Sequence, residues 1–163
     1  MRALFLLPLL PLLLSAVVSL GCGPTVDLSK ALQVTDVATG WHDVGVVEGK
    51  NKLVPAVRFR LKNTSDQTLS TLQVNALFRR VSEPDEWGSG FLRVTGSDGL
   101  AAGASSDPLT INSQLGYTGL ESRADLLKNR FFVDAKVEIF AKYASTQWTR
   151  LGEFPIARQL ELH

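Results

Sequence analysis

The side chains that most often carry nucleophilic or metal chemistry are scarce in this 163-residue chain. It has one cysteine, Cys22, and two histidines, His42 and His163. A zinc site takes about four ligands of cysteine, histidine or carboxylate type, and these residues are not spaced to supply such a set. We therefore expect no metal and no other cofactor.

Two short segments combine residue types that can do chemistry. Residues 41–43, Trp-His-Asp, place an imidazole beside a carboxylate. A nucleophilic triad also needs a serine close to the histidine in space, and no serine here lies in a nucleophile-elbow pattern. Glu83, Asp85 and Glu86 surround Pro84, which favours a solvated turn over a calcium loop with its six to eight oxygen ligands. We predict no catalytic residue, although only the fold can decide whether two carboxylates face each other as in glycosidases.

The three tryptophans are the remaining candidates for binding. Trp87 and Trp41 lie at the edges of predicted loops, so we expect both as candidate partner contacts, because tryptophan is enriched among residues that dominate interface energies. Trp87 has an equally good structural explanation, which is to pin a hairpin to the core. Trp148 follows the clearest strand pattern, and we expect it to be buried.

The charge balance excludes some partners. Arg2 is the only charge in the first 21 residues, which leaves 16 Lys+Arg and 16 Asp+Glu in the remainder. A formally neutral chain is a poor candidate for nucleic acid, where neutralisation of phosphates supplies much of the affinity. The same balance gives no net attraction to anionic lipid headgroups.

The first 21 residues are typical of a secretory leader. Met1-Arg2 precedes an uncharged, leucine-rich run at residues 3–21, which matches the positive and apolar regions of a signal peptide. The run is long enough for a membrane span, but Pro8 and Pro11 disfavour a straight helix. At its end, Ser19-Leu20-Gly21-Cys22 resembles the lipobox of bacterial lipoproteins.

The resemblance implies cleavage before Cys22 and acylation of its thiol. Two or more acyl chains give stable membrane attachment. Ser19 departs from the leucine that the family usually has there, and an ordinary signal peptide followed by a free thiol is the alternative. Gly23 in place of an aspartate implies the outer membrane, facing the periplasm, if the bacterium is Gram-negative. The predicted organisation is a signal peptide at 1–21, a lipidated tether at 22–30 and one domain at 31–163.

Alternation of apolar and polar residues dominates the domain. It predicts an all-β fold, an immunoglobulin-like antiparallel β-sandwich of about seven strands with one short helix. Phe59, Val74, Val137 and Ile139 are expected in the core. The strands are expected near residues 32–37, 57–61, 72–78, 87–94, 109–115, 133–141 and 148–156, with the helix at 122–129.

The segment at residues 57–78, VRFRLKNTSDQTLSTLQVNALF, resembles the first hairpin of FxLYD-type immunoglobulin-like domains of exported bacterial proteins. The resemblance covers about 22 residues and ends after Arg80. It implies a fold and carries no active site. The pattern itself predicts that residues 57–61 and 72–78 pair as an antiparallel hairpin.

Two functional classes fit these observations. The first is a membrane-anchored, non-enzymatic interaction or assembly module of the bacterial cell envelope, with an envelope protein as its partner. The alternative is an envelope hydrolase acting on peptidoglycan or polysaccharide. The lack of a recognisable nucleophile, metal set or cofactor loop favours the first, and we expect no enzyme.

The leader generates the first testable prediction. Mass spectrometry of the protein extracted from membranes is expected to show Cys22 as an acylated mature N-terminus. A soluble protein with a free Cys22 thiol, or an uncut chain that begins at Met1, would contradict the lipid anchor.

Overall fold

The computed structural model describes residues 26–161. The predicted signal peptide, Cys22 and the first part of the predicted tether lie outside these residues, so the lipid anchor stays a prediction. Between residues 26 and 161, no helix is both long enough and apolar enough to cross a bilayer.

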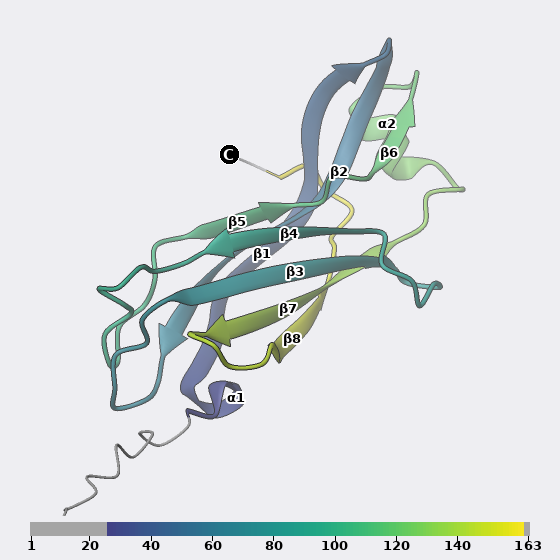
Figure 1. Ribbon diagram of the computed structural model, residues 1–163. Coiled ribbons are helices and arrows are strands. Elements are labelled where there is room, and N and C mark those ends of the chain that lie inside the picture. The colour runs from purple at the N-terminus through teal and green to yellow at the C-terminus, as the bar shows by residue number, and fades with distance from the viewer. Residues whose placement is uncertain (1–25, 162–163) are drawn as a thin grey trace, which may run out of the picture.

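Residues 26–161 form two antiparallel sheets that pack face to face (Figure 1). This confirms the all-β sandwich, with eight strands in place of about seven and two short helices in place of one. The first sheet contains β1 (Leu32–Val47), β2 (Lys50–Asn63) and β5 (Leu109–Asn112), with β6 (Tyr117–Gly119) also paired to β2. The second has the order β4 (Gly88–Arg93), β3 (Leu72–Arg80), β7 (Ala135–Tyr143) and β8 (Thr149–Pro155), and the helices are α1 (Leu28–Ala31) and α2 (Arg123–Lys128).

The chain changes sheet between β2 and β3, again between β4 and β5, and again before β7. This connectivity is the Greek-key pattern of immunoglobulin-like sandwiches. The predicted hairpin between residues 57–61 and 72–78 is therefore wrong, because these segments belong to opposite sheets. β2 pairs with β1, β5 and β6, whereas β3 pairs with β4 and β7. Alternation shows that one face of a strand is buried. It does not show which sheet the strand belongs to, because strands of both sheets in a sandwich bury one face in the same core.

The core forms between the two inner faces. Phe59, Val74, Val137 and Ile139 are each 0% exposed, which confirms their predicted burial. The predicted helix is also confirmed: the Ser122 side chain caps α2, and α2 buries Leu126 and Leu127.

The domain begins before its predicted boundary at residue 31. Asp27 caps α1 by accepting a hydrogen bond from the Ser29 backbone N–H, and Leu28 is buried. The part of the predicted tether at 27–30 thus belongs to the domain, which leaves a shorter connection to Cys22.

β1 and β2 form a hairpin that is much longer than the strand predicted at residues 32–37. They pair from Leu32 opposite Asn63 to Val47 opposite Lys50. The end of this hairpin, residues 43–53, extends beyond the sandwich beside β6 and α2 (Figure 1); we call it the arm.

Pro55 lies at the point in β2 where the neighbouring strand changes. β5 pairs with β2 from Ala56 onward, and β6 pairs with β2 up to Leu53. A proline that lacks its N–H is tolerated at such a gap.

Asn63 joins the loops at the other end of the sandwich. Its side chain is fully buried, and its amide nitrogen donates to the carbonyl oxygens of Gln67, Leu100 and Ala101 at 2.8, 2.9 and 3.1 Å. Its side-chain oxygen accepts from the Ser65 backbone N–H at 3.0 Å. One residue thus holds the β2–β3 crossover against the loop that leads to β5.

Replacing Asn63 with alanine is expected to destabilise the domain by about 3 kcal/mol, because the fully buried Asn63 side chain makes hydrogen bonds to three carbonyl groups and all of them are lost. Urea unfolding would measure the loss, with Asn75→Ala as the matched control on the outer face of β3. Equal stabilities for the two variants would contradict the role assigned to Asn63.

Candidate functional site

Four aromatic side chains pack together where the arm leaves the sandwich. Trp41 of β1 is 0% exposed. Its ring centroid lies 4.6 Å from that of Phe132, 5.6 Å from that of Tyr117 and 6.1 Å from that of Trp87. These residues come from four separate parts of the chain, so the cluster fixes the arm to both sheets. The Arg80 guanidinium lies 5.4 Å from the Trp87 ring centroid, which adds a cation–π contact.

The structure reverses the predicted exposure of two tryptophans. Trp41 is buried and cannot be a direct partner contact, because β1 continues past residue 37 and places position 41 within a strand that faces the core. Trp148, predicted in the core, is 41% exposed, because β8 begins only at Thr149. Trp87 is partly buried and packs against the core, which agrees with its structural explanation.

Contacts along one side of the arm hold it in place. β6 pairs with β2 from Asn51 to Leu53. The Asn51 side-chain amide donates to the Glu121 carbonyl at 2.7 Å, and Asp43 forms an ion pair with Arg123 of α2. Gly116 permits the close approach, since a Cβ atom there would lie 2.0 Å from the Leu53 carbonyl oxygen. The arm is therefore a supported three-stranded element.

The far end of the arm carries exposed apolar side chains beside Glu48 and Lys50, the charged and exposed residues at its turn. Val44, Val46 and Val47 of β1 are 45%, 65% and 38% exposed, and Leu120, which follows β6, is 80% exposed. Clustered apolar side chains on a surface often mark a site of association. We call these four residues the arm tip.

The outer edge of β1 is covered at residues 39–41 and open beyond them. The Trp41 backbone N–H donates to the Gln159 carbonyl at 2.8 Å, and the Glu161 N–H donates to the Trp41 carbonyl at 3.0 Å. Between residues 26 and 161, no strand pairs with the outer edge of β1 at residues 43–47. A bulge between Asp43 and Gly45 distorts this edge, as is common for edge strands that avoid indiscriminate pairing.

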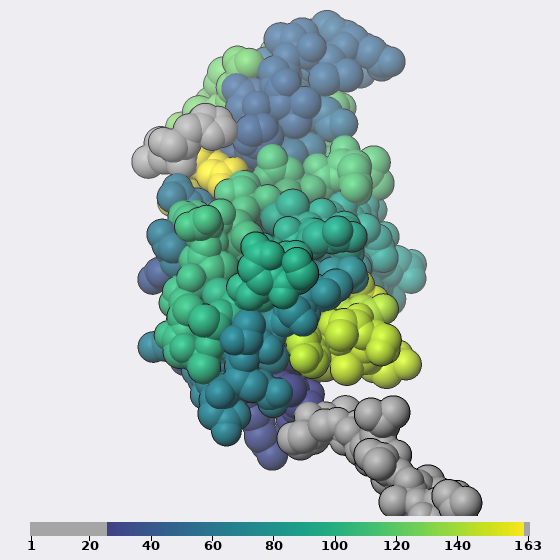
Figure 2. Space-filling model, turned by 60° about the vertical axis from the view of Figure 1, so that its left-hand side comes forward, coloured from purple at the N-terminus to yellow at the C-terminus, as the bar shows by residue number. Residues whose placement is uncertain are grey.

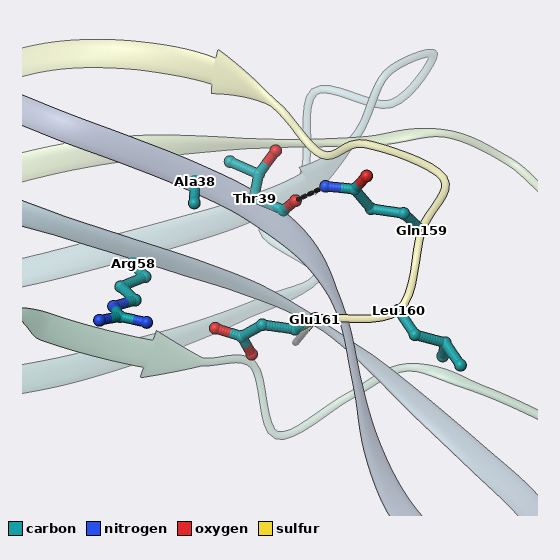
Figure 3. Close-up of a pocket in the computed structure, with 6 residues that line it drawn as sticks. All are labelled: Ala38, Thr39, Arg58, Gln159, Leu160 and Glu161. Atoms are coloured by element: carbon teal, nitrogen blue, oxygen red, sulfur yellow. Dashed lines mark hydrogen bonds between the residues drawn. The ribbon is translucent and has the colours of Figure 1, made fainter. Parts of the chain in front are cut away.

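The C-terminal segment also lines a small pocket at the base of the arm (Figure 3). Arg58 and Glu161 extend into it from opposite sides, and the Gln159 side-chain nitrogen donates to the Thr39 carbonyl at 3.1 Å. The lining contains a guanidinium, an amide and a single carboxylate. These groups can hold a small polar group.

The other chemistry-bearing residues have separate partners. The Nδ1 atom of His42 lies 3.9 Å from a carboxylate oxygen of Glu161, whereas Asp43 pairs with Arg123. In the acidic turn, Glu83 pairs with Arg80 at 3.0 Å. Within the described chain, no three histidine, cysteine or acidic side chains converge as a metal-binding group.

Comparison with known proteins identifies no family for this chain. No family model matches the chain, and no curated protein matches it. Among solved structures, the chain resembles one described as the "X-ray structure of Northeast Structural Genomics Consortium target SoR45". The two chains are 13% identical with a TM-score of 0.45, over 80% of this chain and 89% of that one.

The two partly exposed tryptophans make a matched pair for a stability test. Trp87→Ala is expected to cost about 2–3 kcal/mol, because it removes ring contacts with Trp41 and Tyr117. Trp148→Ala is expected to cost less than about 1 kcal/mol, as is usual for surface positions. Thermal and urea unfolding would measure both. A larger loss for Trp148→Ala would contradict the assignment of Trp87 to the cluster.

Proposed function

We propose that this protein is a lipid-anchored, non-enzymatic interaction module of the bacterial cell envelope, and that the arm binds a protein partner. The observation that carries the proposal is the supported arm with its apolar tip and open β1 edge. Rigid presentation favours binding, since a preformed surface loses little conformational entropy on association.

The position of the arm relative to the N-terminus supports this role. α1 lies at one end of the domain and the arm at the other (Figure 1). If Cys22 carries lipid, the short connection before α1 keeps the α1 end beside the membrane, and the arm tip becomes the part farthest from it. With Gly23 after Cys22, we expect the outer membrane of a Gram-negative bacterium, so that the arm extends into the periplasm.

The contact that we propose combines backbone pairing with apolar packing. An extended partner segment can add to the open edge of β1 through main-chain hydrogen bonds. Val44 and Val46 would supply side-chain specificity. The side chains of an edge strand affect whether another strand can pair with it, and a lysine at such a position disfavours the pairing.

Val46→Lys is expected to weaken partner binding by at least about tenfold without loss of stability, because the charge must be desolvated in the interface. Val81 is 56% exposed in the turn after β3, so Val81→Lys is the matched control. Cross-linking from position 46 or 81 in solubilised membranes, followed by affinity measurement with the captured protein, would test the difference.

Equal affinity of both variants for that protein would contradict the arm as the binding element. Turnover of peptidoglycan, polysaccharide or an ester by the purified protein would contradict the non-enzymatic proposal.

A further inference from the structure

We propose that the outer face of the second sheet rests on a membrane surface of anionic lipid headgroups, near the place where the chain is anchored. This inference rests on the lipid anchor of the proposed function, but it concerns a surface separate from the arm. Three aromatic and two basic residues define what we call the lower face: Phe91, Phe140, Trp148, Arg93 and Lys142.

Register places these residues together. Asn75 of β3 pairs with Phe91 on one side and Phe140 on the other, while Gln73 pairs with Arg93 and Lys142. Paired residues in antiparallel strands direct their side chains to the same face. This is the outer face, because the intervening Val74 is fully buried.

The aromatic residues of the lower face are accessible. Phe91 is 56% exposed and Trp148 is 41% exposed, and their ring centroids lie 6.4 Å apart in an edge-to-face contact. The contact with Phe91 places the Trp148 ring over the same face of the sheet. Aromatic side chains of this kind are favoured at the boundary between headgroups and acyl chains.

The charges on this outer face are unbalanced although the whole chain is nearly neutral. Glu138 accepts hydrogen bonds from Arg79 and Arg150, both at 2.8 Å. The hydrogen bond from Arg79, aided by that from Arg150, holds the pKa of Glu138 below its usual range. Across residues 26–161, no carboxylate forms an ion pair with Arg93 or Lys142. The whole outer face of the second sheet has five basic and two acidic residues, which gives it a net charge of +3. The basic residues are Arg79, Arg93, Lys136, Lys142 and Arg150, and the acidic residues are Glu138 and Glu153.

The lower face lies at the anchored end of the domain. α1 contacts both β7 and β8, and the turn that carries Trp148 lies at the same end of the molecule as α1, opposite the arm (Figure 2). Only five residues lie between Cys22 and Leu28, so this end stays within about 20 Å of a lipidated cysteine. An anionic bilayer is then the surface that these basic and aromatic side chains meet.

The test uses the chain from residue 22 onward with Cys22→Ser, so that lipid attachment cannot contribute. The protein is mixed with vesicles of pure phosphatidylcholine, or of phosphatidylcholine and phosphatidylglycerol in equal amounts, and bound protein is measured by sedimentation. We expect binding to the anionic vesicles only. Lys142→Glu is expected to weaken it at least about tenfold, and Trp148→Ala several-fold.

The matched control is Lys62→Glu, an exposed lysine on the outer face of the first sheet, which makes the same change in net charge. Its binding is expected to equal that of the parent, with all variants unfolding at the parent temperature. No binding to anionic vesicles, or an equal loss for Lys62→Glu and Lys142→Glu, would overturn the proposal. Capture of a protein by a cross-linker at position 148, with no vesicle binding, would assign the face to a protein instead.

These results are distinguishable from failure of the proposed function. An unlipidated Cys22 leaves the vesicle measurement unaffected, and loss of the arm's partner with Val46→Lys does not involve the lower face.

Discussion

The packing of Trp41 determines how the arm relates to the sandwich. Its indole occupies the point where β1 stops facing the second sheet and begins to extend beyond it, and it is fully buried there. Tyr117, Phe132 and Trp87 close around it from three other segments. Aromatic packing of this kind adds a geometric preference to the burial of apolar area. Without it, the arm would depend on its pairing with β6 and its contacts near α2, and a small sheet without a packed face is marginally stable in water.

Local patterns predict the strands well and their partners poorly. The alternation at residues 72–78 and 133–141 identifies β3 and β7 together with their buried faces, and Ser122 correctly begins α2. The hairpin prediction fails because the turn after Asn63 is equally compatible with a crossing between sheets. Non-local contacts favour the crossing, among them the hydrogen bonds of Asn63 to the loop at residues 100–101.

The arm and the tryptophans show why the site itself was harder to predict. Residues 38–47 contain two glycines, Gly40 and Gly45, and a polar pair at His42-Asp43, so they lack strand periodicity. Gly40 allows the backbone at Gln159 to approach, and Gly45 has a positive φ of 96° in the bulge. Part of the signal for the lower face was present in the sequence, since Phe140 is an apolar residue at an otherwise charged outer position of its strand. The positive charge of this surface could not be predicted from the net charge of the chain. The net charge adds the charges of all surfaces together, whereas the fold places them on separate faces.

The edge of β1 beside Trp41 is covered by residues 159–161, so the first strand of the domain depends on its last residues. The hydrogen bond between Gln159 and Thr39 joins positions 120 residues apart. Contacts of such separation form late, since the entropy of closing the loop opposes them. During synthesis from the N-terminus, the edge of β1 at residues 39–41 therefore stays open until residues 159–161 have been made. The nascent domain is most vulnerable to pairing with other strands in this interval, and the interval ends when residues 159–161 pair with β1.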